Sequence, residues 1–214
     1  MKKLYYLVIW FVVTLVFQNC SGCLFSECLE NKYAFTEPVQ FYPESKILHV
    51  GDTLWFYSGF SCFNMLNLVD GDSVSICDTP ELVNRLGFEE YINDTFPSTP
   101  AADKFDCFAL DGSVFSDPKH NPSIHRYVQY AKDTNRFELL IGIVLKESGN
   151  FGIYVGDIPN ILWKKPERDC DDMCSFNFEI TNADRHLEIL YEFLDGKPIS
   201  EAITVNYYCF EVVN

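Results

Sequence analysis

Basic residues are scarce in this chain. Its 214 residues include 16 lysines and arginines against 31 aspartates and glutamates, which gives a formal net charge of −15. Nucleic-acid binding depends on basic side chains that neutralise phosphates, and docking on anionic lipid by a basic patch needs the same residues. The composition therefore argues against both partners and is typical of an acidic surface that keeps a domain in solution.

An apolar run long enough to span a membrane is also missing at the start of the chain. The uncharged segment 4–17 holds about fourteen residues, whereas a transmembrane helix needs about twenty. Lys2 and Lys3 precede this segment, and the small residues Ser21 and Gly22 come just before Cys23. This order predicts a secretory signal peptide over residues 1–22, cleavage before Cys23 and a location outside the cytoplasm.

Two readings of the new N-terminus stay open. Cys23 after Ser21 and Gly22 resembles a lipobox, so acylation of Cys23 would hold the domain on a membrane surface; Cys20 is a less favoured lipid site. In the other reading the domain is freely secreted or periplasmic. In either case we expect residues 23–34 to form a tether and residues 35–214 to form a single domain, because about 190 residues suit one core.

The cysteines indicate disulfides, since an exported protein meets an oxidising compartment. Cleavage before Cys23 leaves an even set of eight, whereas lipidation of Cys23 leaves seven and one unpaired thiol. Eight cysteines allow about 105 connectivities, so the sequence assigns none. We expect Cys209 to be bridged within the core, and we favour a disulfide over a metal site for Cys170 and Cys174. The candidates are Cys28, Cys62, Cys77, Cys107, Cys170, Cys174 and Cys209.

Apolar residues alternate with polar ones in several segments, as they do in half-buried strands. The segment 175–181 is the clearest case. The segment 137–145 predicts a central strand buried on both faces, paired through a hairpin at 133–135 with 124–132 and followed by a third meander strand at 151–155. Further strands are expected at 46–50, 53–58 and 203–210.

Helices are few in the predicted pattern. Thr181 or Asn182 can cap a helix that ends at Gly196, and a second, weaker helix is expected over 80–93. Many short strands with a helix as crossover predict a mainly β fold, namely an immunoglobulin-like antiparallel β-sandwich with one or two short helices.

Sequence motifs for catalysis are absent: there is no Gly-x-Ser-x-Gly elbow and no recognisable cysteine–histidine or two-carboxylate frame. Two weak metal candidates remain. His120 and His125 lie in a proline-containing polar loop, and Asp169, Asp171 and Asp172 could offer oxygen ligands to calcium. A solvated loop and an acidic turn explain these residues equally well, and we expect no cofactor.

Aromatic residues make up 16% of the chain and gather around one predicted strand. If Leu54 and Phe56 face the core, Trp55 and Tyr57 face outward and could form a stacking platform for a sugar ring or a protein partner. The alternative is that both faces of the sheet are covered and that these two residues belong to the core.

Three segments carry a resemblance: Gly51-Asp52-Thr53-Leu54-Trp55-Phe56, Gly149-Asn150-Phe151-Gly152-Ile153-Tyr154 and Tyr207-Tyr208-Cys209-Phe210-Glu211-Val212. Together with the signal and its cysteines, they resemble uncharacterised surface or periplasmic lipoproteins of Bacteroidetes-type bacteria. The resemblance implies a secreted sandwich and no known activity. Cys20, at the place where a lipobox normally has an aliphatic residue, departs from that pattern.

The sequence thus predicts an exported, non-enzymatic domain that acts in binding or in cell-envelope structure. Its protein or glycan partner is not specified by any motif. The alternative is a surface carbohydrate-binding component or a hydrolase whose site is assembled from residues distant in the sequence.

Overall fold

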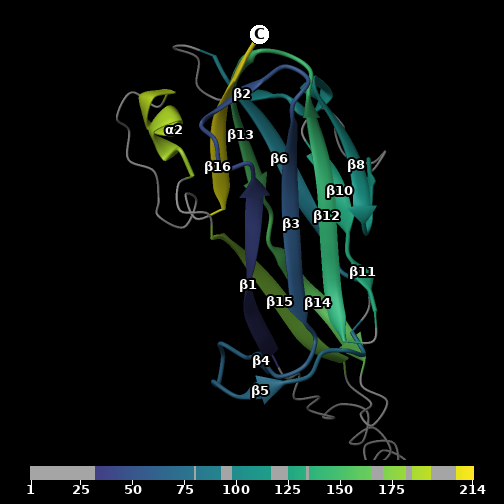
Figure 1. Cartoon of the computed structure of the whole chain (residues 1–214). Coiled ribbons are helices and arrows are strands. Elements are labelled where there is room, and N and C mark those ends of the chain that lie inside the picture. Colours follow the sequence, from purple (N-terminus) through teal and green to yellow (C-terminus); the bar gives the residue numbers. More distant parts are fainter. Residues whose placement is uncertain are drawn as a thin grey trace, which may run out of the picture.

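The computed structural model describes residues 32–79, 81–92, 98–116, 125–133, 135–164, 171–181, 185–193 and 206–214. Two sheets pack face to face with the core between them (Figure 1). The predicted signal peptide 1–22, with Cys20, and the candidates Cys23 and Cys28 lie outside the described residues. Within the described part, no helix is long and apolar enough to cross a membrane.

The first sheet has the order β11-β12-β3-β1-β15-β14, and β8 also pairs with β12. β1 runs parallel to β15, while its other pairing, with β3, is antiparallel. The strands are β1 (Lys32–Tyr42), β3 (Thr53–Ser61), β8 (Phe105–Asp111), β11 (Ala131–Lys132), β12 (Arg136–Leu145), β14 (Ile158–Lys164) and β15 (Asp171–Ile180). Residues 32–34, assigned to the tether from sequence, therefore already lie in the first strand.

The second sheet has the order β2-β16-β13-β6-β10-β9, and β7 also pairs with β6. Its pairings are antiparallel except that of β16 with β2. The strands are β2 (Ile47–His49), β6 (Val83–Tyr91), β7 (Thr99–Pro100), β9 (Ser113–Phe115), β10 (His125–Gln129), β13 (Gly149–Val155) and β16 (Tyr207–Val213).

Three smaller pieces complete the described structure. A short hairpin of β4 (Met65–Leu66) and β5 (Ser73–Val74) follows β3, and the 3-10 helix η1 (Ala102–Lys104) precedes β8. The helix α2 (Leu187–Phe193) lies beside β16 (Figure 1). It begins later than the helix predicted from Thr181 or Asn182, since residues 185 and 186 are not helical, and the predicted end at Gly196 falls outside the described residues, as do 182–184 and 194–205.

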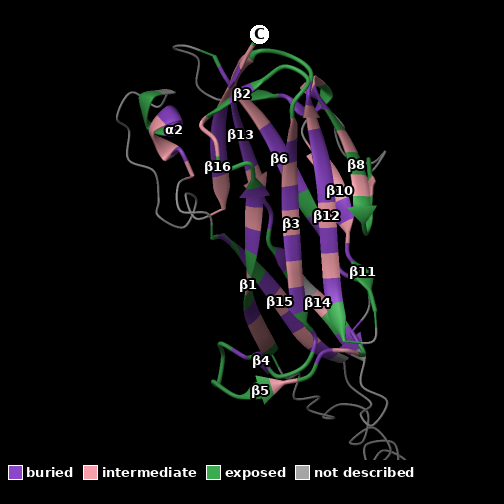
Figure 2. Cartoon of the chain, in the orientation of Figure 1, coloured by how far each residue is buried: buried purple, intermediate pink, exposed green. Residues whose placement is uncertain are grey.

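The core follows from the period-two alternation of the strands, which places every second side chain between the sheets. Buried and half-buried positions alternate along β3 and β12 (Figure 2). Rings from the two sheets meet directly: Phe41 of β1 stacks on Tyr208 of β16 with 4.7 Å between centroids. The predicted mainly β sandwich with one or two short helices is confirmed. The predicted antiparallel pairing holds except between β1 and β15 and between β16 and β2, which are parallel.

The helix predicted over 80–93 is wrong, because residues 83–91 form strand β6. Leu86 and Phe88 are fully buried on its inner side, while Arg85 points outward and is exposed. Over such a short segment, the apolar residues fit the period of a helix as well as that of a strand. Hydrogen bonding to β10 and β13 makes the segment a strand.

The predicted hairpin between 124–132 and 137–145 is wrong in most of its length. β10 pairs with β6 and β9 in the second sheet, and only the two residues of β11 pair with β12. Between β10 and β11, Tyr130 carries the chain from one sheet to the other. Its amide donates to the carbonyl of Leu82 at 3.0 Å, and its hydroxyl donates to Ser58 Oγ at 3.0 Å.

The predicted meander is also wrong in its last step, because β13 joins β6 and β16 in the second sheet instead of β12. The strand β12 is central in the first sheet, as predicted, and Leu139, Ile141 and Ile143 are fully buried. Its second face is only partly covered, since Leu140 and Val144 are half-buried. Of the predicted segment 175–181, residues 175–180 lie in β15, with Phe176 and Phe178 buried as expected.

One carboxylate shares the inner side of β1 with apolar residues. Glu37 has the same alternation as the buried Phe35 and Val39, and it pairs in register with the buried Phe178. Burial raises the pKa of Glu37 to about 7. Tyr130 lies near enough for the charge of Glu37 to contribute to the raised pKa of its phenol, although burial is the main cause.

Candidate functional site

The outer side of the second sheet carries a row of aromatic rings that the core does not use. We call Phe115, His125, Tyr127, Tyr154 and Tyr207 the aromatic face. They alternate along their strands with residues that point into the sandwich, including Val128, Ile153 and Tyr208. Phe115 is 41% exposed and the other four rings are half-buried.

Neighbouring rings of the aromatic face contact one another across the strands. Phe115 and Tyr127 stack with 5.8 Å between centroids, and Tyr154 and Tyr207 lie 5.7 Å apart. The ring of His125 meets that of Tyr154 edge-on at 5.9 Å, and the two side chains approach to 3.4 Å between His125 Nδ1 and the Tyr154 hydroxyl. These separations are those of favourable aromatic pairs.

A glycine makes room for the central ring. Gly87 of β6 lies between His125 and Tyr154 in the sheet register. A Cβ at Gly87 would come within 1.7 to 2.5 Å of three ring atoms of Tyr154. The Tyr154 ring therefore rests across β6 on the backbone of Gly87, which only glycine permits at that position.

Charged side chains lie next to the rings of the aromatic face. The guanidinium of Arg85 lies 5.7 Å from the Tyr154 centroid, within cation–π range. Burial raises the pKa of Glu89, and hydrogen bonds from Ser98 and Tyr207 offset part of that rise. Burial likewise raises the pKa of Tyr154 and of Tyr207, so both keep their phenolic protons at neutral pH.

A shallow pocket of about 230 Å³ opens at one end of the aromatic face. Its lining includes Arg85, Tyr154, Asp157, Asn206 and Tyr207. Asn206 Nδ2 donates to Asp157 Oδ1 at 3.3 Å, whereas Asn206 Oδ1 is buried and has no hydrogen-bond partner among the described residues. The pocket thus combines the N–H donors of Arg85, the exposed carboxylate of Asp157 and the buried amide oxygen of Asn206 next to the Tyr154 ring.

The helix α2 limits the aromatic face on one side. Ile189 and Leu190 pack on Tyr91 and Cys209, which point outward from β6 and β16. Tyr91 in turn occupies the space over Gly152, where a Cβ would lie 2.3 Å from its hydroxyl. The helix covers this part of the sheet and leaves the rings around Tyr154 open.

Trp55 and Tyr57, the predicted platform, lie on the outer side of the first sheet. Leu54 and Phe56 are fully buried, and Trp55 and Tyr57 are half-buried on the opposite side of β3. The Trp55 ring meets Phe108 edge-on at 5.6 Å. The two residues therefore point outward and lie on the other sheet from the aromatic face, and their predicted role in binding stays a prediction.

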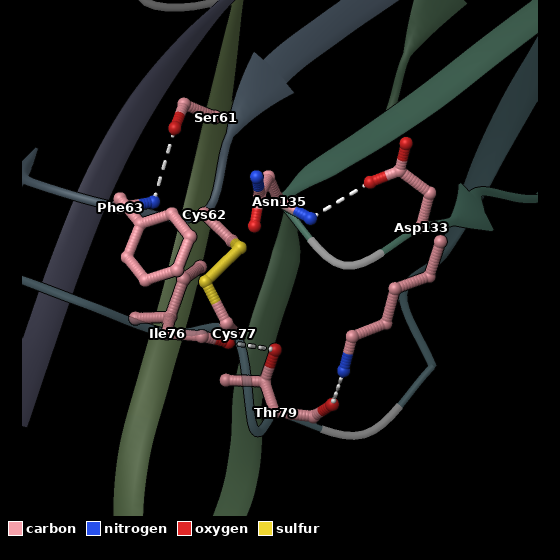
Figure 3. The surroundings of a disulfide bond; sticks show 9 residues. Ser61, Cys62, Phe63, Ile76, Cys77, Thr79, Asp133 and Asn135 are labelled. Carbon is pink, nitrogen blue, oxygen red and sulfur yellow. Dashed lines mark hydrogen bonds between the residues drawn. A yellow bond between two sulfur atoms is a disulfide. The ribbon is translucent and has the colours of Figure 1, made fainter.

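The disulfide candidates have different outcomes in the structure. Cys62 is bonded to Cys77, 15 residues further on, and the bond closes the segment that holds the β4–β5 hairpin (Figure 3). Around it, the Cys62 amide donates to the Asn135 carbonyl at 2.9 Å and the Ile76 amide donates to the Cys62 carbonyl at 2.8 Å. Cys174 is buried in β15, and Cys28 and Cys170 lie outside the described residues.

Two cysteines of the described part carry free thiols, Cys107 and Cys209. The expected bridge of Cys209 is therefore a wrong prediction, since its side chain points to α2 and Tyr91 and meets no other cysteine there. Burial raises the pKa of each thiol to about 12. Both behave as small core residues.

The metal candidates are not brought together among the described residues. His125 belongs to the aromatic face, whereas Asp172 is fully buried in β15 of the other sheet. Asp171 begins β15 opposite Lys164 in the register, and His120 and Asp169 lie outside the described residues. Within the described part, no three histidine, cysteine or acidic side chains form a group that could hold a metal ion.

Sequence reasoning missed most of the aromatic face. Because a helix was predicted over 80–93, Arg85 and Gly87 were not placed on a strand beside the rings. The segment of β10 was paired with the wrong strand. The alternation of 151–155 places Tyr154 on the face opposite to Ile153, as observed. That of 203–210 places Tyr207 on the same side as Cys209, which was predicted in the core, whereas Tyr208 and Phe210 of the opposite side are the residues packed between the sheets. What it lacked was the pairing that brings these strands together.

Comparisons with known proteins do not assign the chain to a family. No protein-family model matches the chain, and no curated protein sequence matches it. Among solved structures, a type II cohesin domain from the cellulosome of Acetivibrio cellulolyticus is similar at 7% identity, over 66% of this chain and 84% of that chain, with a TM-score of 0.28. A score this low carries no argument about function, and the resemblance to Bacteroidetes-type lipoproteins stays a prediction.

Proposed function

We propose that this chain is an exported, non-enzymatic binding domain whose ligand site is the aromatic face of the second sheet. The observation that carries the proposal is the row of five rings over β9, β10, β13 and β16, with Arg85 and the pocket beside it. These side chains do not fill the core, and α2 leaves them open. Exposed aromatic clusters with a few placed polar groups are typical of binding sites.

The sheet suits this role because it is rigid. Each ring stands on a strand that pairs on both sides, except Phe115 at the edge, and the inner side of each strand packs into the core. A site on paired strands is held in place before the ligand arrives, which lowers the entropic cost of binding. The stacked and edge-on ring pairs further restrict the side chains.

Export is supported by the disulfide Cys62–Cys77, because such bonds persist in oxidising compartments. The acidic composition agrees with a domain that stays soluble there. Cleavage before Cys23 and acylation of Cys23, or of Cys20, belong to the proposal as the means of attachment. The intact mass of the mature protein from its own host gives the first residue and any acyl chain. A retained segment 1–22 would contradict export by this signal.

The binding site is tested by thermal-shift screening of two probe sets, a peptide library and a set of soluble polysaccharides. We expect at least one probe to raise the melting temperature of the wild type. The same probe should lose its effect on Tyr127→Ala/Tyr154→Ala and keep it on Trp55→Ala/Tyr57→Ala, which alters the opposite sheet. If the second variant loses the effect and the first keeps it, the site lies on the first sheet and the proposal is wrong; if no probe acts, it is also wrong.

A further inference from the structure

We infer that the aromatic face binds a neutral polysaccharide, with one sugar ring stacked on Tyr154 and its hydroxyl groups held in the adjoining pocket. The inference rests on the proposed function and specifies the ligand class. Four features of the described residues support it: the position of the Tyr154 ring, the polar groups of the pocket, the length of the row of rings and the distribution of charge.

Tyr154 offers a flat surface. Three atoms of its ring lie over the Cβ position of Gly87, so one side of the ring rests on the backbone of β6. The residue is only half-buried, so part of its side chain is exposed to solvent, with the Arg85 guanidinium 5.7 Å from the ring centroid. A sugar ring presents a flat patch of C–H groups, and such a patch packs on an aromatic surface of this kind.

The pocket beside Tyr154 holds the groups that hydroxyls need. Arg85 brings a fork of N–H donors, and the exposed carboxylate of Asp157 accepts hydrogen bonds. Asn206 Oδ1, buried at the same place, has no partner among the described residues. A hydroxyl both donates and accepts, so a single sugar can satisfy donors and acceptors together. The volume of about 230 Å³ lies below the usual range for drug-sized ligands and suits one ring.

The row of rings is longer than this pocket. From Phe115 on β9 to Tyr207 on β16 it crosses β10, β6 and β13, which is four interstrand steps of about 4.8 Å, or about 19 Å in all. The stacked pair of Phe115 and Tyr127 supplies a second aromatic surface at the far end. A chain of several sugars can occupy both ends, whereas a single sugar cannot.

The charges favour a neutral chain over a polyanion and over a protein. Asp157 lines the pocket with Arg85, the charge of Glu89 also acts on Tyr154, and the whole chain has a net charge of −15, which repels acidic polymers. The centres of protein interfaces are depleted in aspartate and glutamate. Here Glu89 and Asp157 lie near the rings, and three of the five rings carry phenolic hydroxyls.

The inference is tested with the mature full-length domain by electrophoresis in native gels that contain β-glucan, xylan, mannan, galactan or the acidic polygalacturonate. We expect at least one neutral polysaccharide to slow the wild type and polygalacturonate to leave its mobility unchanged. Arg85→Gln, Asp157→Ala and Tyr154→Ala should each weaken the retardation about tenfold or more, as the loss of a charged hydrogen bond or a stacked ring predicts. Trp55→Ala on the first sheet should match the wild type.

The outcomes separate this inference from the proposed function. Retardation by a neutral polysaccharide that the three variants lose supports both. If no neutral polysaccharide slows the wild type but a peptide raises its melting temperature through the aromatic face, the glycan assignment is wrong and the binding site stands. Retardation that Arg85→Gln and Asp157→Ala leave unchanged also overturns the inference. The melting temperature of each variant shows that it is folded.

Discussion

The ring of Tyr154 on β13 occupies the space that a side chain at Gly87 on β6 would fill. The two residues are neighbours in the register of the second sheet, and an added Cβ at Gly87 would lie 1.7 Å from the nearest ring atom. A glycine in a strand is unfavourable by itself, since it adds backbone entropy to the unfolded chain and has no side chain to pack. At this place it lets an aromatic ring lie on the outer side of the sheet.

Gly87→Ala should displace the Tyr154 ring. We expect a loss of about 1–3 kcal/mol in the free energy of unfolding, which is the usual range for overpacking, measured by urea denaturation. The double variant Gly87→Ala/Tyr154→Ala serves as the control, because it removes the ring that clashes. In a double-mutant cycle, Gly87→Ala should lower the free energy of unfolding much less in the Tyr154→Ala background than in the wild type. Equal costs in both backgrounds would show that the clash does not decide the effect.

Removal of the Cys62–Cys77 disulfide should lower stability without changing the fold. For a closed loop of 15 residues the loss of unfolded-state constraint corresponds to about 3 kcal/mol. Cys62→Ala/Cys77→Ala is compared with the wild type by urea denaturation, with and without reductant. Reductant should destabilise the wild type more than the variant, which lacks this bond. A wild type indifferent to reductant would show that the bond contributes nothing to stability.

Glu37 should make stability depend on pH. Burial raises its pKa from 4.5 to about 7, so the folded state favours the protonated form. The contribution of this group is fully present below about pH 4.5 and is lost as the pH rises through about 7. The pKa shift sets an upper limit of about 3 kcal/mol on the contribution of Glu37 to the free energy of unfolding. Solvent screening of the partly exposed carboxylate makes the actual contribution smaller.

The measurement compares the wild type with Glu37→Gln, which stays neutral at every pH. Urea denaturation from pH 4.5 to pH 7.5 should show the wild type losing stability relative to the variant as the pH rises. Other groups, such as Glu89, titrate in both proteins and cancel in the difference. A difference that stays constant over this range would place the pKa of Glu37 near its ordinary value.

Cys107 and Cys209 should resist alkylation in the folded protein. A pKa of about 12 in place of 9.0 leaves about a thousandfold less thiolate at neutral pH, and the thiolate is the reacting form. Iodoacetamide labelling followed by peptide mass mapping should find both residues unmodified in buffer and modified in denaturant. Fast labelling of Cys209 in buffer would contradict its burial beneath α2.

Local patterns were enough to place side chains on the correct side of a strand. The alternation in 53–58 puts Leu54 and Phe56 on one side of the strand and Trp55 on the other; in the structure the first two are buried and Trp55 is half-buried on the outer side. The same holds for Phe176 and Phe178 of β15. A strand has a period of two whatever its partner is, so this information lies within a few consecutive residues.

The aromatic face could not be found in this way. Its residues extend from Phe115 to Tyr207 along the chain. They lie on one surface only because β10 pairs in the second sheet, whereas the next strands, β11 and β12, pair in the first. Tyr130, whose hydroxyl donates to Ser58 of the opposite sheet, marks that crossing. Periodicity says nothing about which strand pairs with which, so the hairpin and the meander predicted from short connections were wrong.

By itself, the sequence determined the class of fold and the inner and outer sides of its clearest strands, because these depend on local alternation of apolar and polar residues. It also determined an acidic composition that argues against nucleic acid as a partner. Only the tertiary structure decided that Gly87 lies beneath Tyr154 and that Arg85, Asp157 and Asn206 share one pocket. Those relationships depend on the pairing of distant strands, which is settled by the packing of the whole core.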